Sequence, residues 1–473
     1  MSRGILALDQ GTTSSRAYLW RDGALRLVGQ HQHRQIRPAP GWVEHDAEEI
    51  LGHLRSLIEA AGPCAAAGLA NQGETVVAWD ATTGRPLHNA IVWQDERTAP
   101  QIEAMRAQGL EALTLARAGL PLDPYFAAAR MRWLLDHAEG ARDLHRQGRL
   151  RLGTSDSFFL ARLTGEAATD IATASRTSLM DIRTGAWDAA LCAAFGVPMD
   201  TLPEIRPSAG DFGTLANGTP VAASLVDQQA ALYGHGCHRP GELKITFGTG
   251  AFALGLTDGV PEAGQKDGLL PTLAWQVTGE APRYALDGGI LTAGAAVEWL
   301  SGLGLLDGGH AGLDGFDGPH AIERGIAFVP ALAGLGCPHW DRAARGCFLG
   351  LGLETDKSQL RRAVLEGIAF RAGELVRAFE ARLGPAPRIA IDGGLSRSAH
   401  FTRFLAAAIG RPIEVAGSAD MTALGMLWLC QAATGDAAKI PAPPGRVVEA
   451  APLPRALHDR FAEAVALSRS WGG

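Results

Sequence analysis

The chain begins with a short apolar run at 5–8, and a polar turn at 9–15 separates it from a second apolar segment at 16–20. Short apolar runs bounded by turn residues indicate buried β-strands, and two such runs around a turn indicate a hairpin. The same pattern recurs at 243–254, where Gly248-Thr249-Gly250 is the turn, and a third strand at 388–391 ends in Asp392-Gly393-Gly394. The sequence therefore predicts three polar turns, each at the end of a buried strand.

Between these strands, apolar residues at helical spacing predict helices. The clearest begins at Asp46, which with Glu49 resembles a capping box, and ends at Gly62. Its apolar face consists of Ile50, Leu51, Leu54, Leu57 and Ile58. Further on, a strand at 221–226 leads into Asp227 and a helical segment at 228–232. Alternation of strands and helices predicts an α/β chain with helices packed on central sheets.

A glycine-rich stretch at 234–241 separates two halves that open with the same strand–turn–strand pattern. A chain of 473 residues is too long for one ordinary hydrophobic core. We therefore expect two related domains, at 1–238 and 239–473.

Composition narrows the functional classes. The chain is 47% hydrophobic and 20% charged, with a net charge of −7 and no long basic run, so we expect no nucleic-acid or membrane partner. The six cysteines form no Cys-x-x-Cys pair, which favours reduced thiols. The first apolar run is too short for a signal peptide, and none is long enough to span a membrane. We expect a cytoplasmic protein.

The polar turns carry the candidate chemistry. Glycines let a backbone approach phosphate closely, and consecutive N–H groups with Thr or Ser hydroxyls donate to its oxygens. Asp9, beside the first turn, could hold Mg²⁺, and Asp227 could act as a base toward a hydroxyl group. Taken singly, each turn is equally consistent with a tight hairpin, and Asp227 with a helix cap.

Taken together, these segments resemble the FGGY family of carbohydrate kinases, among which the glycerol-kinase branch is the most similar, over residues 4–435. The matching segments of the first half are 8–16 (LDQGTTSSR), 41–46 (GWVEHD), 90–94 (AIVWQ), 123–126 (DPYF), 174–177 (ASRT) and 227–232 (DQQAAL). Those of the second half are 247–250 (FGTG), 334–341 (GLGCPHWD) and 392–394 (DGG).

The resemblance implies an actin-like ATPase fold, in which two ribonuclease-H-like domains close around a cleft, and transfer of phosphate from ATP to a small polyol or sugar with Mg²⁺. It implies that Asp9 and Asp227 face the metal and that Asp227 is also the base. It implies polyol contacts from Glu74, Trp93, Tyr125, Asp227, Gln228 and Phe252. The nucleotide contacts implied are Thr12, Thr13, Ser14, Arg16, Thr249, Gly294, Glu298, Gly394 and Ser398. We also expect a homo-oligomer, either a dimer or a tetramer.

Three positions depart from the pattern of glycerol kinases. Gly73 stands where an Arg usually precedes Glu74, which removes a fork of hydrogen-bond donors and leaves volume in the pocket. Another residue or water replaces those contacts, or the substrate is larger, such as erythritol, xylulose or ribulose. Glu298 and Ser398 stand where Gln and Asn are usual, and both can still bond to a nucleoside.

Two other classes use the same fold, because a fold alone does not fix function. A chaperone- or filament-like ATPase would have no use for Glu74, Trp93 and Tyr125 together. An inactive sugar sensor would not need both Asp9 and Asp227. The kinase is the hypothesis that uses all five residues.

Overall fold

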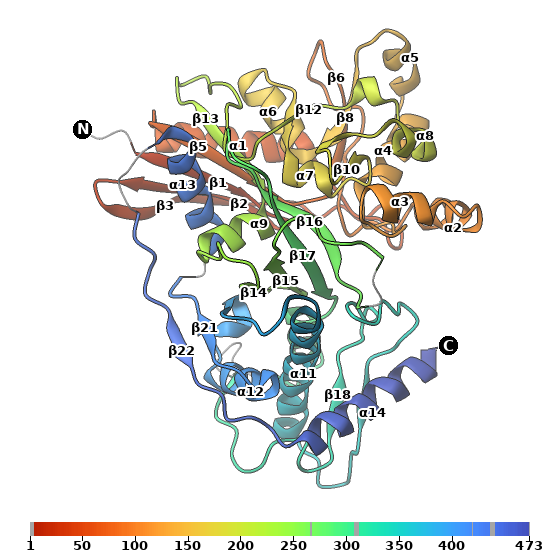
Figure 1. Ribbon diagram of the computed structural model, residues 1–473, viewed down its shortest axis with the longest axis vertical. Coiled ribbons are helices and arrows are strands. Elements are labelled where there is room, and N and C mark those ends of the chain that lie inside the picture. Colours follow the sequence, from red (N-terminus) through yellow and green to blue (C-terminus); the bar gives the residue numbers. More distant parts are fainter. Residues whose placement is uncertain (1–3, 265–266, 307–311, 419, 436–439, 473) are drawn as a thin grey trace.

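The computed structural model describes residues 4–264, 267–306, 312–418, 420–435 and 440–472. The chain folds into two lobes, with the first half above and most of the second half below in Figure 1. Each lobe is a β-sheet covered by helices, so the predicted α/β class is confirmed.

The first lobe is built on a five-stranded sheet in the order β13-β5-β1-β2-β3. Strands β1 (Ile5–Gln10), β5 (Ala66–Asn71) and β13 (Val221–Val226) run parallel. Strands β2 (Ser14–Arg21) and β3 (Ala24–Gln32) complete an antiparallel meander after β1. The predicted hairpin at the start of the chain is therefore confirmed.

Alternation of side chains along β1 gives this sheet two buried faces. Leu6 and Leu8 face α1 (Ala47–Ala61) and α6 (Ser155–Thr164), whereas Ile5 and Ala7 belong to a core on the other face. Helix α1 begins as predicted, because the Asp46 carboxylate accepts hydrogen bonds from the backbone N–H groups of Glu48 and Glu49. It ends at Gly62.

The rest of the first half forms smaller units around this sheet. A four-stranded sheet has the order β4-β7-β6-β8, and two-stranded sheets pair β9 with β12 and β10 with β11. The strands are β4 (Glu44–His45), β6 (Val76–Asp80), β7 (Ala90–Ile91), β8 (Leu150–Thr154), β9 (Ala168–Asp170), β10 (Met180–Asp181), β11 (Ala186–Trp187) and β12 (Glu204–Arg206). The helices are α2 (Ala99–Ala107), α3 (Glu111–Arg117), α4 (Ala127–His137), α5 (Ala141–Arg146), α7 (Ile171–Ser175), α8 (Ala189–Phe195), α9 (Asp227–Gly234) and the 3₁₀ turn η1 (Met199–Thr201).

The second lobe repeats the arrangement of the first around a seven-stranded sheet, β16-β17-β15-β14-β20-β21-β22. Strand β14 (Leu243–Phe247) forms the predicted hairpin with β15 (Ala251–Leu256) and runs parallel to β20 (Ile389–Gly393). Strand β21 (Ile413–Val415) is parallel to β20 in turn. The strands β14, β15, β17, β20 and β21 thus correspond to β1, β2, β3, β5 and β13.

The other elements of the second half complete its layers. Its remaining strands are β16 (Leu270–Trp275), β17 (Arg283–Ile290), β22 (Arg446–Val448) and the pair β18 (Ala327–Val329) and β19 (Cys347–Leu349). Its helices are α10 (Gly294–Gly302), α11 (Lys357–Leu383), α12 (Ala399–Ile409), α13 (Met421–Thr434), α14 (Arg455–Gly472) and the 3₁₀ turn η3 (Gly394–Arg397).

Helix α13 crosses from the second half of the chain to the first lobe. In Figure 1 it lies beside β1 and β5, and it packs on these strands, on β13 and on α9. Its apolar residues join a core that also contains Leu254 of β15 and Leu273 of β16. Helices α9 and α13 therefore lie between the two sheets and join the lobes.

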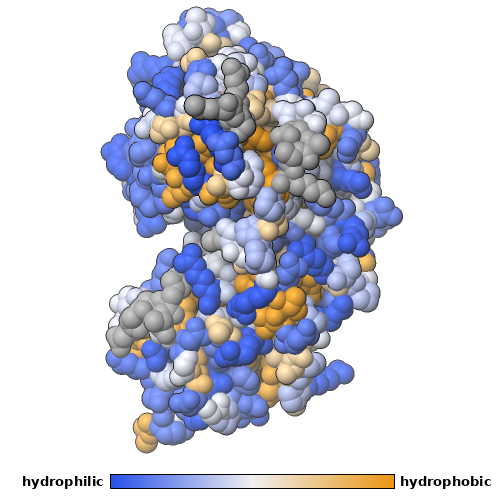
Figure 2. All heavy atoms as spheres, turned by 90° about the vertical axis from the view of Figure 1, so that its left-hand side faces the viewer, coloured by the Kyte–Doolittle hydropathy of each residue, from blue (hydrophilic) through white to orange (hydrophobic). Residues whose placement is uncertain are grey.

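Figure 2 shows a largely hydrophilic surface that is notched between the upper and lower lobes. Among the helices of the described residues, none is both long and apolar enough to cross a membrane.

Candidate active site between the lobes

The carboxyl ends of the parallel strands meet at one edge of each sheet, and these two edges face each other. In the first lobe, β1 leads into Gly11-Thr12, β5 into Gln72-Gly73-Glu74, and β13 into Asp227. In the second lobe, β14 leads into Gly248-Thr249-Gly250 beside the end of β20. Ligands of open α/β sheets bind outside such strand ends.

A cavity of about 160 Å³ lies between these edges. It brings together all six residues predicted to contact the polyol, and Thr12 and Thr249 as well. Its described lining residues are Thr12, Gln72, Gly73, Glu74, Trp93, Tyr125, Arg176, Val226, Asp227, Gln228, Gln229, Thr246, Gly248, Thr249, Gly250, Phe252, Leu254 and Asp287.

Three aromatic side chains form one wall of the cavity. The ring of Trp93 packs edge-on against Tyr125 and Phe252, with centroids 5.7 and 6.1 Å apart. The indole N–H of Trp93 donates to Thr12 Oγ1 at 3.0 Å, so the ring is held at both its apolar and its polar edge. This wall offers apolar surface to the carbon atoms of a small ligand.

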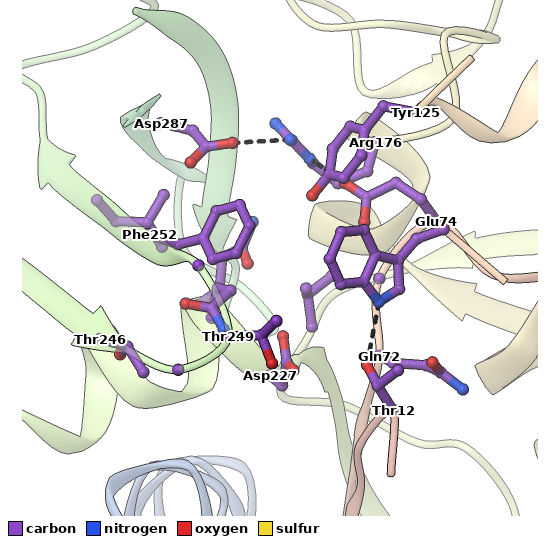
Figure 3. Close-up of a pocket in the computed structure, with 18 residues that line it drawn as sticks. Thr12, Gln72, Glu74, Tyr125, Arg176, Asp227, Thr246, Thr249, Phe252 and Asp287 are labelled. Atoms are coloured by element: carbon purple, nitrogen blue, oxygen red, sulfur yellow. Dashed lines mark hydrogen bonds and ion pairs between the residues drawn. The ribbon is translucent and has the colours of Figure 1, made fainter. Parts of the chain in front are cut away.

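An ion-pair chain centred on Arg176 crosses the cavity from one lobe to the other (Figure 3). Arg176 Nε donates to Glu74 Oε1 and Nη2 donates to Asp287 Oδ2, both at 2.7 Å. Glu74 follows β5 of the first lobe, whereas Asp287 lies on β17 of the second. Burial raises the pKa of Glu74, and the guanidinium of Arg176 opposes that shift.

The backbone at Glu74 is held in an unusual conformation. Its φ of 58° lies in the left-handed region, which few non-glycine residues adopt. The buried Arg130 stabilises this turn, because its Nη2 donates to the carbonyl oxygens of Glu74 and Tyr125 at 3.0 and 2.5 Å. Its Nη1 donates to the carbonyl of Val92, next to Trp93, at 2.7 Å. One guanidinium thereby positions three segments that line the cavity.

Asp227 lies at the floor of the cavity, as the first residue of α9. The N-cap position of α9 is Val226, so the structure does not support the alternative that Asp227 is a helix cap. Burial and the neighbouring carboxylate of Asp9 raise the pKa of Asp227 to about 7, against the opposing effect of Lys244. Burial also raises the pKa of Asp9. Asp9 itself lies outside the residues that line the cavity, so its effect on the site is exerted through the charge it places near Asp227.

Lys244, on β14, is a fully buried cation that interacts electrostatically with Asp227. Its Nζ donates to Gln228 Oε1 at 2.5 Å and to Thr246 Oγ1 at 3.0 Å. Burial lowers the pKa of Lys244, while Asp392 and Asp227 raise it. Lys244 therefore orients a predicted polyol-binding amide and offsets the negative charge of the site.

A divalent cation fits the pair formed by Asp9 and Asp227. No group of three or more His, Cys, Asp or Glu side chains in the described ranges is arranged to hold a metal ion alone. Mg²⁺ needs fewer protein ligands, because it is usually bound by one or two carboxylates together with phosphate oxygens and water. Burial is the main cause of the raised pKa of both carboxyl groups, and a cation bound beside them would favour their charged forms.

The second-lobe turns approach each other backbone to backbone. Gly294, at the start of α10, donates its N–H to the carbonyl of Gly248, and a Cβ at 294 would lie 2.5 Å from that oxygen. Gly393 has a φ of 94°, and a Cβ there would lie 2.2 Å from the carbonyl oxygen of Phe247. Gly394 follows as the first residue of η3. Glycine is therefore required sterically where the sequence predicts a nucleotide.

The other predicted nucleotide residues lie outside the cavity lining. Thr13 is exposed at the tip of the first hairpin, whereas Ser14 is buried. Arg16, on β2, lies 3.8 Å from Asp420. Glu298 is exposed on α10.

The last of these predicted residues, Ser398, is at the start of a helix. Its hydroxyl caps α12 by accepting a hydrogen bond from the N–H of Phe401, and it lies 3.1 Å from Asp314 Oδ1. Their roles as nucleotide contacts stay predictions.

Four residues of the site had no role in the sequence analysis: Arg130, Arg176, Lys244 and Asp287. Arg176 lies in segment 174–177, which supports the family resemblance but does not by itself indicate what Arg176 contacts. The others have no local pattern that separates them from ordinary charged residues, because their partners lie far along the chain.

Comparison with known proteins identifies the family. Residues 4–234 match the N-terminal domain of the FGGY family of carbohydrate kinases, and residues 243–434 match its C-terminal domain. The chain belongs to the FGGY family of carbohydrate kinases. This FGGY kinase is thus a phosphotransferase, and membership of a kinase family implies the use of ATP.

Relatives of this FGGY kinase are similar over nearly the whole chain. A glycerol kinase of Trichlorobacter lovleyi is 43% identical over 449 residues, which cover 91% of this chain and 90% of the relative. A glycerol kinase of Thermus brockianus is 44% identical over 441 residues, covering 90% and 88%. The crystal structure of Plasmodium falciparum glycerol kinase with ADP is 29% identical, with a TM-score of 0.87 over 99% of this chain and 98% of that one. A xylulose kinase from Rhodospirillum rubrum, 24% identical with a TM-score of 0.82 and 99% coverage of both chains, shares the fold.

Proposed function

We propose that this FGGY kinase transfers the γ-phosphoryl group of ATP to a terminal hydroxyl of glycerol, forming glycerol 3-phosphate, with Mg²⁺ as the metal. The observation that carries the proposal is the position of Asp227, which lies in the cavity between the aromatic wall and the second-lobe turn at 248–250 and whose pKa is raised by burial and by the charge of Asp9. Phosphoryl transfer needs a carboxylate near the hydroxyl and donors around the moving group, and this cavity supplies both.

In this reaction Asp227 accepts the proton of the attacking hydroxyl. The oxygen bonds to the γ-phosphorus while the bond from phosphorus to the oxygen of ADP breaks, and ADP leaves. A base with a pKa near the working pH is suited to this step, and the raised pKa of Asp227 meets that condition. Asp9 and Asp227 would hold Mg²⁺, whose charge stabilises the phosphate oxygens.

The phosphate oxygens would be bound by the two polar turns. Thr12 and Thr249 line the cavity from opposite lobes, so donors reach it from both sides. Gly248, Gly250, Gly294, Gly393 and Gly394 have no side chains, which leaves backbone accessible where the rest of the nucleotide would lie. Closure of the lobes around both substrates would exclude water, which otherwise competes for the phosphoryl group.

The size and lining of the cavity support a small polyol. Its volume of about 160 Å³ is below the range of roughly 300–1,000 Å³ found for sites of drug-sized ligands. Glu74, Asp227 and Gln228 offer polar groups to three hydroxyls, and the aromatic wall covers the carbon atoms. The similarity to glycerol kinases supports glycerol over erythritol, xylulose and ribulose.

A coupled assay of ADP release over a panel of alcohols tests this proposal. The panel contains glycerol, dihydroxyacetone, erythritol, xylitol, ribulose and xylulose, with a reaction lacking any alcohol as the control for ATP hydrolysis. We expect glycerol to give the highest kcat/KM and glycerol 3-phosphate as the product. A ketose or a longer polyol in first place would refute glycerol and support the alternative that Gly73 raises.

We also propose that the protein acts in the cytoplasm as a homo-oligomer, a dimer or tetramer, and that its domains divide near residue 239. The family matches end at 234 and resume at 243, which supports that division. Helix α13 is the exception, since it packs on the first lobe.

A further inference from the structure

Arg176 has an unpartnered buried donor in the polyol cavity. Its side chain is 3% exposed, and Nε and Nη2 are bonded to Glu74 and Asp287. Among the described residues, Nη1 has no hydrogen-bond partner of good geometry, although it is buried and the guanidinium is near enough to the Tyr125 hydroxyl to oppose the raised pKa of that phenol. A buried N–H group of a charged side chain without a partner is costly, so a bound ligand that accepts from it gains binding energy.

The guanidinium is also held firmly in place. Its carbon lies 5.4 Å from the ring centroid of Phe126 and 5.9 Å from that of Tyr125. With two ion pairs and two rings around it, Arg176 has little freedom to turn Nη1 away from the cavity. A donor fixed in advance loses little entropy when a hydroxyl binds.

Arg176 is the one basic residue among the described residues that line this cavity. Gly73, where a guanidinium would be expected, contributes no side chain, and a Cβ there would lie 3.1 Å from Val226 Cγ1. The cavity lining therefore obtains its cationic donor from the residue that follows α7 instead of from the segment before Glu74.

The contacts of Arg176 also connect the two lobes. Its position at the end of α7 and the partner Glu74 belong to the first lobe, whereas Asp287 belongs to β17 of the second. Opening the cleft would break the pair with Asp287 and leave Nη2 without that partner. A ligand bound between Nη1 and Glu74 would hold the same guanidinium and thereby favour the closed arrangement.

We propose that Arg176 determines specificity in this kinase: Nη1 donates to a hydroxyl of the polyol, in place of the Arg absent at position 73, and the pair with Asp287 couples polyol binding to closure of the lobes. This inference rests on the proposed function, because it assigns a second donor to the same polyol site.

The first experiment compares glycerol with its two deoxy analogues, 1,2-propanediol and 1,3-propanediol, by calorimetric titration of the wild-type protein and of Arg176→Met in the presence of ADP. We expect Arg176→Met to weaken glycerol binding about 10- to 100-fold, the range for a hydrogen bond to a charged group. For the analogue that lacks the hydroxyl contacted by Nη1, the same substitution should weaken binding much less than it does for glycerol. An equal loss for glycerol and both analogues would show a structural role only and overturn the proposal.

Folding of Arg176→Met is checked by its melting temperature and its affinity for ADP. If it does not fold, the titrations are made with Arg176→Lys instead. Lys keeps the positive charge but cannot bond to Glu74, Asp287 and the ligand hydroxyl at once. We expect this variant to show the same selective loss for glycerol to a smaller degree. Unchanged discrimination between glycerol and the analogues in Arg176→Lys would contradict the proposal.

The second experiment measures coupling between the lobes as the ratio of glycerol affinities with and without ADP. We expect Asp287→Asn to bring this ratio close to one. The matched control is Arg342→Met. It removes the ion pairs of Arg342 with Glu96 and Asp123, which also join the lobes but are exposed to solvent. The control should keep the wild-type ratio, and a wild-type ratio in Asp287→Asn would refute the coupling.

These measurements separate the inference from the proposed function. Binding does not require turnover, so a wild-type protein that releases no glycerol 3-phosphate refutes the function, whereas the pattern of affinities decides the role of Arg176. If another alcohol ranks first in the panel, the same variants are titrated with that alcohol and with its deoxy analogues.

Discussion

At the scale of single residues, the site depends on buried charged side chains that are held by partners from distant segments, such as Arg130, which bonds to the carbonyl of Glu74, and Arg176, which bonds to Asp287. Asp227 and Glu74 stand in recognisable segments, so their presence in one cavity could be predicted. The turn at Glu74 and its support by Arg130 could not, because a φ of 58° is set by contacts with a helix more than fifty residues further along the chain. Charged residues have many surface roles, and sequence alone does not show which of them are buried.

Lys244 gives a prediction at this scale. Replacement by Met removes the donor to Gln228 Oε1 and the cation that lowers the pKa of Asp227. A base must be deprotonated to act, so a higher pKa of Asp227 moves the acidic limb of the pH profile to higher pH. We expect Lys244→Met to raise the KM for glycerol and to shift the acidic limb of kcat/KM for glycerol to higher pH.

The control for Lys244 is Lys357→Met, which removes the same charge from an exposed position at the start of α11. It should leave the pH profile of kcat/KM as in the wild-type protein. An acidic limb at the same pH in Lys244→Met and in the control would show that Lys244 does not act on the base.

At the scale of elements, the strand–turn–strand pattern was sufficient to predict both hairpins, because short apolar runs around a polar turn have few other solutions. Helix α1 could likewise be predicted from its cap and its apolar face. The position of α13 could not be predicted in the same way. Its buried residues lie on all sides, which indicates a helix inside the protein but does not indicate the sheet on which it packs.

The contact between α9 and α13 is close enough to depend on glycine. A Cβ at Gly425 of α13 would lie 1.8 Å from the carbonyl oxygen of Ala230 in α9. Even Ala at this position would push the two helices apart, and overpacking of this kind costs about 1–3 kcal/mol or more. We expect Gly425→Ala to lower the melting temperature and, because these helices join the lobes, to lower kcat.

Gly52→Ala is the matched control, since Gly52 lies inside α1 and a Cβ there meets no atom within 4 Å. It should raise stability by about 0.5–1 kcal/mol through helix propensity. A melting temperature for Gly425→Ala at or above that of the wild-type protein would contradict the close packing of α9 on α13.

At the scale of the whole molecule, the repeated strand order explains why the site lies between the lobes. Each sheet brings the ends of its parallel strands to one edge, and α9 and α13 set the two edges against each other. The fold and the family could be predicted from motifs spread along the chain. The chain of contacts from Glu74 through Arg176 to Asp287 could not, because it forms only when residues from both lobes meet.

The proposed chemistry depends on Asp227, which lines the polyol cavity and whose pKa is raised by burial and by the charge of Asp9. The most direct test is the turnover number of Asp227→Asn with saturating glycerol and ATP, measured beside its affinity for ATP. We predict a loss of about 100- to 10,000-fold in kcat, the usual contribution of a general base, with ATP affinity close to that of the wild-type enzyme. Undiminished turnover in Asp227→Asn would contradict the account.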